Sequence, residues 1–342
     1  MRVVAGLSLR NLQPRVWDAA SPYALAGLEA VMVSWAEIAS APRWRERAMN
    51  VGMHAALGIP ESVQVYLDNG AFAFLRAHRT VDHTAYATFV QRAMPDWYPI
   101  PQDFIPTPRM SAAEQQCCFQ RTMDVNAAFA HDGYVPVLHI GPLLPQYIAA
   151  ITADARYAAK PVVALGAIVP NLLRAPKALP YEQVLDSLVL TRAAFPDRML
   201  HVFGLGGTAT LHIAGLLGID SADSSGWRNR AARGLVQLPG RGDRLVAELG
   251  SWRGREPSLE EWELLAACPC PACRDAGIDG LRARGIAGFA HRATHNLWTL
   301  LREAEEITQH LSDGSYPDWY AAHLDNTVYR PLIDRLVRKR FS

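Results

Sequence analysis

The sequence predicts an α/β fold: a (β/α)8 TIM barrel with an inserted zinc-binding subdomain before the last helix. Three observations predict it. Eight short apolar or β-branched runs alternate with longer segments of helical spacing, the chain of 342 residues is half apolar, and a Gly-, Arg- and Pro-rich stretch interrupts the pattern near its end. Strands that alternate with helices form parallel βαβ units, and eight such units close into a barrel more readily than they form an open sheet.

The eight predicted strands are short runs that a helical pattern follows each time. They cover residues 3–5, 30–34, 63–67, 97–105, 134–140, 161–168, 199–203 and 216–221. The fourth is the weakest prediction, because Pro99, Pro101 and the nearby Pro106 cannot donate backbone hydrogen bonds to a neighbouring strand.

The stretch from 226 to 295 is too long for a simple loop. It predicts a zinc-binding insertion at 226–295, so that the barrel catalytic domain comprises 1–225 and 296–342. A helix that begins near Thr294 has its apolar residues at helical spacing and is expected to pack back on the barrel. These apolar residues are Leu297, Leu300, Leu301, Ala304 and Ile307.

Composition limits the class of protein. The sequence has no run of about 18 apolar residues of the kind that spans a bilayer, and its first residues show no signal-peptide cleavage pattern. We therefore expect a cytoplasmic protein without a membrane partner. Three of the five cysteines lie close together, which favours a metal site in a reducing compartment over a disulfide framework.

The crowded cysteines are Cys268, Cys270 and Cys273, and His295 follows them at the start of the predicted helix. Three thiolates and one imidazole form the donor set of a tetrahedral Zn2+ site, and four protein ligands leave no position for a reacting water. The sequence therefore predicts a structural zinc ion as cofactor. His291 is an alternative fourth ligand, and free core cysteines are the alternative to a metal site.

Charge is nearly balanced overall, at +1, but arginines are clustered. Seven arginines lie between positions 228 and 255, and the segment 330–340 is also basic. Arginine forks match phosphate oxygens, so these clusters could follow a nucleic-acid backbone. The alternative is an ordinary solvated basic face.

Aspartates lie at or near the ends of three predicted strands: Asp68, Asp103, and the pair Asp220 and Asp223. Barrel enzymes carry their chemistry at the carboxyl ends of the strands, so these carboxylates are candidate catalytic groups. A single aspartate after a strand is more often a helix cap. Several such positions in one predicted barrel favour a shared site.

The order of motifs resembles the queuine and archaeosine tRNA-guanine transglycosylases over residues 63 to 306. The motifs are Asp-Asn-Gly-Ala-Phe at 68–72, His-Val-Phe-Gly-Leu-Gly-Gly at 201–207, Gly-Ile-Asp-x-x-Asp-Ser at 218–224, Cys-x-Cys-x-x-Cys at 268–273 and His-Asn-Leu at 295–297. The resemblance implies that Asp68 is the general acid/base and that Asp223, rather than Asp220, is the nucleophile. It also implies the residues that bind the base: Asp103, Phe72, Phe203 and Gly166.

These roles agree with the chemistry of a glycosidic bond. Breaking it gives oxocarbenium character at C1′, which one carboxylate can trap while a second carboxyl group protonates the leaving base. A carboxylate such as Asp103 can accept from N1–H and the 2-amino group of guanine. Two aromatic faces offset part of the cost of taking the base out of its stack.

Two departures from the family pattern lie at the base-binding side. Asn69 and Ala71 stand within the first motif, where the tRNA enzymes have Ser and Gly, and Ala73 follows where they have Gln. His139-Ile140-Gly141 stands where they have a Gln-Gly pair, so His139 is a substitute donor to the base. These departures favour the branch that resembles the DpdA-type DNA-modifying transglycosylases, which exchange guanine in DNA for a 7-deazaguanine such as preQ0. The alternative substrate is tRNA, and the resemblance suggests a homodimer or an accessory partner protein.

Two further readings remain. One is a non-catalytic nucleic-acid-binding accessory subunit that keeps the barrel and the zinc, against which the retained aspartates argue. The other takes the glycine cluster at 204–208 as a phosphate site of a small-molecule lyase or isomerase, which leaves the cysteine cluster unexplained.

Overall fold

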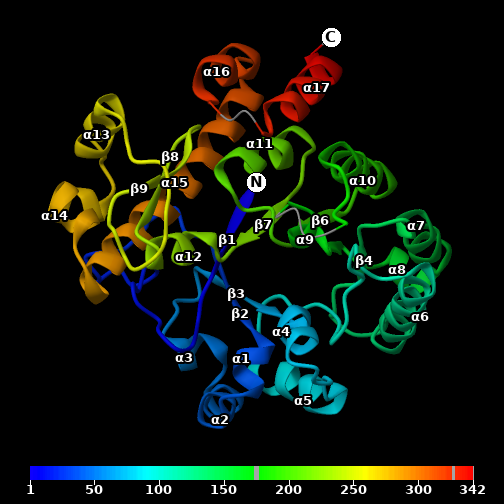
Figure 1. The fold of residues 1–342 in the computed structure, drawn as a ribbon. Coiled ribbons are helices and arrows are strands. Elements are labelled where there is room, and N and C mark those ends of the chain that lie inside the picture. The colour runs from blue at the N-terminus through cyan, green and yellow to red at the C-terminus, as the bar shows by residue number, and fades with distance from the viewer. Residues whose placement is uncertain (173–176, 326–327, 342) are drawn as a thin grey trace.

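Seven parallel strands form one curled sheet at the centre of the molecule (Figure 1). The computed structural model describes residues 1–172, 177–325 and 328–341. Among these residues the strand order is β3-β2-β1-β7-β6-β5-β4, and the alternation with helices confirms the predicted α/β class. The strands are β1 (Arg2–Gly6), β2 (Ala30–Ser34), β3 (Gln64–Asp68), β4 (Val137–His139), β5 (Val162–Gly166), β6 (Met199–Val202) and β7 (Ser221–Ser224).

A short segment joins the two edge strands of this sheet. Tyr66 of β3 pairs in parallel with Trp97, and Pro99 pairs in parallel with Val135, just before β4. The Leu67 amide donates to the Trp97 carbonyl at 2.8 Å. The strands and this segment therefore follow one another around a closed barrel.

The prediction of a full strand over residues 97–105 is wrong in its length. Only Trp97 and Pro99 form bridges, to Tyr66 of β3 and to Val135 just before β4. Pro99 and Pro101 have no N–H to donate, so a regular ladder cannot continue through them. The segment closes the barrel by isolated bridges instead.

The predicted eighth strand, residues 216–221, is shifted. Leu216 is the last residue of the preceding helix, and Gly218, with φ of 65°, turns the chain before Ile219. The strand itself is β7, Ser221–Ser224. As a consequence Asp223 lies within the strand and Asp220 lies just before it.

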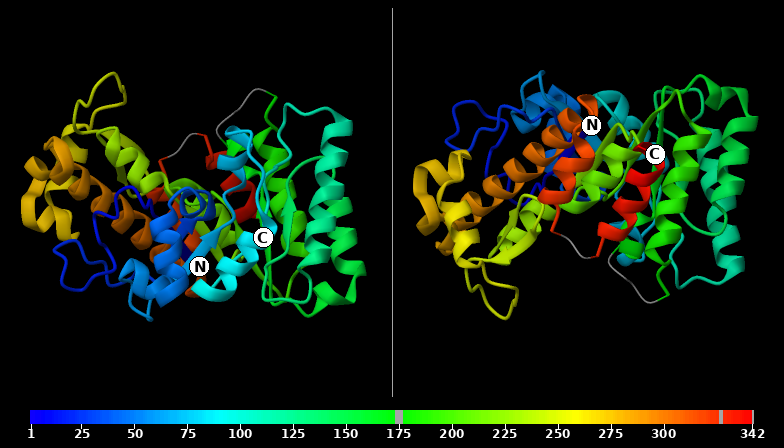
Figure 2. Two further views of the ribbon diagram at one scale, coloured as in Figure 1. Left: turned by 90° about the horizontal axis from the view of Figure 1, so that it is seen from below. Right: turned by 90° about the horizontal axis from the view of Figure 1, so that it is seen from above.

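Helices surround the sheet (Figure 1). In both views of Figure 2, α13 and α14 lie at the opposite end of the molecule from α6 and α7. The helices are α1 (Trp35–Ala39), α2 (Pro42–Val51), α3 (Met53–Leu57), α4 (Ala71–Arg76), α5 (His83–Ala93), α6 (Ala112–Ala128), α7 (Leu144–Ala153), α8 (Ala155–Ala158), α9 (Ile168–Leu172), α10 (Tyr181–Ala194), α11 (Thr208–Leu216), α12 (Gly226–Ala232), α13 (Leu259–Ala266), α14 (Pro271–Arg282), α15 (Gly285–Ser312), α16 (Tyr316–His323) and α17 (Arg330–Phe341).

The main core lies in and around the barrel. Val4, Val31, Val33 and Leu67 are fully buried. Strands covered on both faces read as continuous apolar runs, which is why these strands could be predicted from the sequence.

The insertion has a small core of its own. After α12 the chain forms an antiparallel hairpin, β8 (Leu235–Leu238) and β9 (Gly242–Leu245), and then α13 and α14. Val236, Leu238, Leu265 and Leu281 pack there with the cysteines. This core is small, so a further stabilising interaction is expected in the lobe.

The long helix α15 links the insertion to the barrel. It begins at Gly285, nine residues before the predicted start near Thr294, and contacts both α14 and α11. The predicted boundary between 295 and 296 therefore falls within one continuous helix.

Glu303 of α15 holds α16 and the β8–β9 turn in place. Its Oε1 lies 2.9 Å from His212 Nε2 and 2.8 Å from His323 Nε2, and its Oε2 accepts from the Gly240 amide. Burial alone would raise the pKa of Glu303, but the hydrogen bonds from the two histidines outweigh burial and lower that pKa. These N···O separations are those of hydrogen bonds, so this cluster is a structural network.

Within the described ranges, no helix combines the length and apolar character that crossing a membrane requires.

Candidate active site and metal centre

Four metal-binding side chains meet where the insertion joins α15: Cys268, Cys270, Cys273 and His295. Their ligand atoms all lie within 4.8 Å of one another. His295 Nδ1 lies 3.5, 3.8 and 3.4 Å from the three sulfur atoms in that order. Tetrahedral bonds of about 2.3 Å to sulfur and about 2.0 Å to nitrogen separate such ligands by about 3.5 Å. The cluster could therefore hold a metal ion such as zinc.

The local fold directs these ligands to one point. Cys270 caps α14, where Pro271 follows it, and its sulfur accepts from the Cys273 amide at 3.3 Å. His295 Nε2 lies 2.9 Å from the carbonyl of Gln237 in β8. That contact fixes the ring with Nδ1 toward the sulfur atoms, as a second-shell partner of a metal ligand does.

His291, the alternative ligand, lies outside this cluster. It precedes His295 by one turn of α15, and its ring packs against Tyr23 with centroids 5.5 Å apart. Burial lowers the pKa of His291. The structure thus assembles His295 with the cysteines.

Asp68 ends β3 at the carboxyl mouth of the barrel. Its Oδ2 accepts from the Gly70 amide at 3.0 Å, and Gly70, with φ of 76°, makes the turn that brings this amide back. Burial first, and then the negative charge of Asp223, raise the pKa of Asp68 to about 6. Asp68 is therefore half protonated near pH 6, as a group that both gives and takes a proton must be.

Asp223 lies in β7 and is 18% exposed. Its Oδ1 accepts from the Gly204 amide at 2.6 Å, and its backbone carbonyl accepts from Gly206 at 3.0 Å. A Cβ on Gly206 would lie 2.5 Å from that carbonyl oxygen, so only glycine fits there. The glycine cluster that could have cradled a phosphate instead packs against Asp223.

Asp220 has a different environment. Its Oδ2 accepts from Arg192 at 3.1 Å and from the Leu200 amide at 2.8 Å. These contacts tie the amino end of β7 to β6 and α10, away from the mouth. Asp220 is thus engaged in structure, whereas Asp68 and Asp223 influence each other electrostatically.

His201 lies beside Asp223, although the sequence analysis gave it no role. Its Nδ1 lies 2.9 Å from Ser221 Oγ, and its Nε2 lies 3.7 Å from Asp223 Oδ1 without a hydrogen-bond partner among the described residues. The ring is fully buried and packs on Trp97 with centroids 4.8 Å apart. The available signal was its position two residues before Phe203 in the predicted strand 199–203, because alternate strand residues share a face.

The two predicted aromatic partners of the base differ in their surroundings. Phe203 follows β6 and packs edge-on against His201 at 4.7 Å. Phe72 lies in the first turn of α4 and is 38% exposed. Among the described side chains no ring contact joins Phe72 to Phe203, and their pairing around a base stays a prediction.

The Asp103 carboxylate accepts two hydrogen bonds within the chain. Its Oδ2 accepts from the Val81 amide at 2.9 Å, and its Oδ1 accepts from Arg121 at 2.7 Å. Arg121 also stacks on Phe104, 4.0 Å from the ring centre. Each oxygen of Asp103 keeps a second lone pair that could accept from a base, and that role stays a prediction.

His139 and Gly166 are register partners at the carboxyl ends of β4 and β5. His139 is 2% exposed, and its Nε2 lies 3.1 Å from the side-chain nitrogen of Gln102. Burial lowers the pKa of His139 to about 3, so the ring is neutral. Its Nδ1 has no hydrogen-bond partner in the part of the chain that the structure describes.

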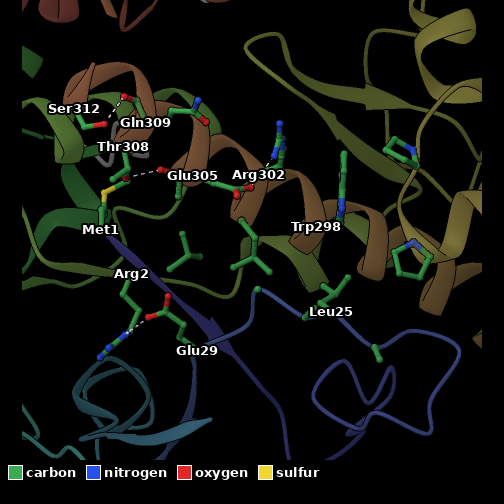
Figure 3. A pocket seen from close by; sticks show the side chains of 18 of the residues that line it. Met1, Arg2, Leu25, Glu29, Trp298, Arg302, Glu305, Thr308, Gln309 and Ser312 are labelled. Atoms are coloured by element: carbon green, nitrogen blue, oxygen red, sulfur yellow. Dashed lines mark hydrogen bonds and ion pairs between the residues drawn. The ribbon is translucent and has the colours of Figure 1, made fainter. Parts of the chain in front are cut away.

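A large pocket lies elsewhere. It encloses about 900 Å3 between the start of β1, the loop before β2, α15 and the cysteine loop (Figure 3). Arg2 pairs with Glu29 on its wall. Because it opens at the amino ends of the strands, it is remote from Asp68 and Asp223, and we do not assign it to their chemistry.

The arginine clusters are largely paired within the chain. Arg228 is buried and donates to the carbonyls of Asn11 and Gln13. Others contact carboxylates: Arg230 to Asp243, Arg241 to Glu260, Arg244 to Glu261 and Arg335 to Asp186. Much of the predicted basic stripe therefore stabilises the fold.

The chain is similar in sequence to tRNA-guanine(15) transglycosylases. The chain is 26% identical over 326 residues to a tRNA-guanine(15) transglycosylase of Pyrococcus abyssi, covering 86% of this chain and 50% of the relative. It is 29% identical over 278 residues to the enzyme of the same name from Haloferax volcanii, covering 79% of this chain and 49% of the relative. The chain thus spans about half the length of the curated relatives it matches.

A family model described as queuine tRNA-ribosyltransferase matches residues 148–328. These residues run from α7 to the start of the last helical segment and include β5 to β7, Asp223 and all four residues of the cysteine–histidine cluster. Since the match covers more than half of the 342 residues, this chain belongs to the queuine tRNA-ribosyltransferase family.

Proposed function

We propose that this chain is a pentosyltransferase that exchanges a guanine in a nucleic acid for a 7-deazaguanine. The observation that carries the proposal is the pair of carboxyl groups at the barrel mouth, in which the charge of Asp223 and burial raise the pKa of Asp68 to about 6. Two carboxyl groups with different environments divide nucleophilic and acid–base roles between them. The named relatives, tRNA-guanine(15) transglycosylases, support the same chemistry.

In this proposal Asp223 attacks C1′ of the target nucleoside. The C1′–N9 bond breaks, a C1′–oxygen bond to Asp223 forms, and protonated Asp68 gives its proton to the leaving guanine. Asp68, now ionised, takes a proton from the incoming base, whose nitrogen then displaces Asp223. Two displacements at one carbon retain its configuration.

Neighbouring groups support the nucleophile. The Gly204 amide holds Asp223 Oδ1 at 2.6 Å and His201 lies 3.7 Å from the same oxygen. The hydrogen bond from Gly204 holds this carboxylate in one orientation for attack on C1′. Phe72 and Phe203 would flank the extruded base, while Asp103, His139 and Gly166 would bind its polar edge.

The metal has a structural role in this proposal. Cys268, Cys270, Cys273 and His295 would hold Zn2+ with no open coordination position, so the ion would stabilise the lobe rather than take part in the reaction. The four ligands join a loop, α14 and α15.

A tRNA substrate is better supported than DNA. The relatives are named tRNA-guanine(15) transglycosylases, whereas the preference for DNA rests on the departures at Asn69 and His139. Phosphate contacts by arginines do not distinguish ribose from deoxyribose. A homodimer or an accessory partner remains part of the proposal.

Labelled-guanine exchange, measured side by side on tRNA and on duplex DNA, tests the proposal. We expect label in tRNA, complete loss with Asp223→Ala, and retained exchange with Asp220→Ala once the folded fraction is matched, because Asp220 pairs with Arg192. Label in DNA alone would overturn the tRNA preference but not the chemistry. Absence of exchange on both, with a folded protein that binds nucleic acid, would support the non-catalytic accessory reading.

A further inference from the structure

A chain of buried polar side chains runs along the barrel mouth from β3 to β4. It consists of Asn69, Gln102 and His139, which are 5%, 1% and 2% exposed. Thr122 of α6 contacts the middle member. Amide and imidazole groups both donate and accept, so the direction of each bond depends on what anchors the ends of the chain.

The first anchor is the turn after β3. Asn69 Oδ1 accepts from the Ala71 amide at 3.1 Å, so its nitrogen points the other way. That nitrogen donates to the Ile100 carbonyl at 2.9 Å and faces Gln102 Oε1 at 3.4 Å. A backbone amide can only donate, and this fixes the orientation of Asn69 and makes Gln102 present its oxygen to it.

The second anchor is α6. Thr122 Oγ1 donates to the Cys118 carbonyl at 2.7 Å, which leaves its lone pairs to accept. Gln102 Nε2 donates to this hydroxyl at 3.4 Å and lies 3.1 Å from His139 Nε2. If the Gln102 amide were rotated by 180°, its NH2 group would face the NH2 group of Asn69, and both are donors. Asn69 and Thr122 therefore favour the same orientation of Gln102.

This orientation determines the tautomer of His139. Because the Gln102 nitrogen donates, His139 Nε2 must accept and cannot carry the proton. The ring is neutral, since burial lowers its pKa to about 3, and the single ring proton is therefore on Nδ1.

The resulting Nδ1–H group faces Gly166. It has no hydrogen-bond partner among the residues that the structure describes. A Cβ on Gly166 would lie 3.1 Å from this nitrogen, so any larger residue at this position would crowd it. An unsatisfied buried donor is unfavourable, and a purely structural histidine would normally have both nitrogens paired.

We propose that Gln102 is a positioning residue that fixes His139 as an Nδ1–H donor, and that this donor selects bases with a carbonyl at position 6 over bases with an amino group there. The identity of the ligand as a guanine-type base rests on the proposed function. A 6-oxo group accepts from Nδ1–H, whereas a 6-amino group would oppose one donor with another. The same chain of hydrogen bonds connects Asn69 and His139, which both depart from the family pattern, through the Gln102 amide.

The tautomer is tested first, on the whole chain and without activity. Nitrogen-15 NMR of histidine-labelled protein distinguishes a protonated from an unprotonated ring nitrogen, and His139→Gln identifies the signals. We expect the Nδ1–H form between pH 5.5 and 8. A signal from the Nε2–H form, or an imidazolium that titrates in this range, would overturn the proposal.

Selection is tested by equilibrium dialysis with labelled guanine and 2,6-diaminopurine. We expect guanine to bind about ten- to a hundredfold more tightly, the range that one unsatisfied buried donor implies. Gln102→Met should lower the ratio of the two affinities about tenfold, because Met cannot donate to His139 Nε2 and no longer fixes the tautomer of that ring. His139→Gln, which keeps an N–H donor, should retain the preference, and His139→Phe should lose it.

Gln120→Met is the matched control. Gln120 is an exposed residue of α6 that donates to Asp124, so this variant makes the same Gln→Met change away from His139. The ratio of the guanine and 2,6-diaminopurine affinities should not change. Equal binding of the two bases, or no binding of either, would refute selection by His139. If guanine is preferred but Asp223 forms no covalent adduct, the proposed chemistry fails while this inference stands.

Discussion

Asp68 lies in surroundings that disfavour its charge. Burial and the nearby negative charge of Asp223 raise its pKa to about 6, while hydrogen bonds from Ser34 and Gly70 act in the opposite direction. A raised carboxyl pKa means that the folded protein holds the proton more tightly than the unfolded chain does. Ionisation of Asp68 therefore lowers the free energy of unfolding. This loss is absent below about pH 4, grows between about pH 4 and 6, and is complete above about pH 6.

Asp68→Asn is therefore expected to stabilise the protein while it abolishes base exchange. The predicted gain in the free energy of unfolding is about 1–3 kcal/mol at pH 8, because a neutral amide avoids the cost of ionising Asp68, and the gain should vanish near pH 4. Urea unfolding at the two pH values measures it. A variant that is equally destabilised at both would show that Asp68 is only structural.

At the scale of elements, the cysteine–histidine cluster holds the lobe formed by β8, β9, α13 and α14. Its apolar core is small, consisting mainly of Val236, Leu238, Leu265 and Leu281. A bound structural metal contributes directly to folding free energy. The lobe should therefore depend on the metal, while the barrel, with its larger core, should not.

Cys273→Ser is expected to remove the metal and to disorder this lobe. Elemental analysis should find about one zinc per chain in the parent and much less in the variant, with hydrogen exchange faster in α13 and α14. Cys117→Ser, at an exposed position on α6 outside the cluster, is the matched control. Unchanged protection of α14 after complete metal loss would contradict a structural role.

The strands could be predicted well from the sequence where apolar runs are uninterrupted, as in β2. The prediction failed where local chemistry works against the pattern: proline stops regular pairing after Trp97, and Gly218 delays β7 until Ser221. The predicted start of α15 is too late because the residues that the helix buries in its first turns are small or polar, among them Gly288, His291 and Arg292.

The site could be predicted only in part. Motif order identified the residues that the structure brings to the mouth, including Asp68, Asp223 and His139. It did not indicate Gln102, whose contact with His139 joins elements distant in sequence, and it gave no role to His201, although that residue begins one of the motifs. It also could not show that Asp103 is paired with Arg121.

At the scale of the whole molecule, one barrel gathers carboxylates from β3 and β7 at one mouth, and a separate lobe carries the cysteine–histidine cluster. The net charge is +1, and many arginines of the described residues pair with carboxylates within the chain. Affinity for nucleic acid should therefore depend on local contacts around the barrel mouth. The slope of log affinity against log salt concentration should be shallow, because few phosphates are contacted.

A search for a covalent adduct between Asp223 and nucleic acid tests the proposed chemistry most directly. The protein is incubated with tRNA and, separately, with duplex DNA, denatured, digested with protease and nuclease, and its peptides are weighed by mass spectrometry. We expect a nucleotide sugar without its base on the peptide that contains Asp223, lost in Asp223→Ala and retained in Asp220→Ala. An adduct on another residue, or free guanine released without any adduct, would contradict the assignment of Asp223 as nucleophile.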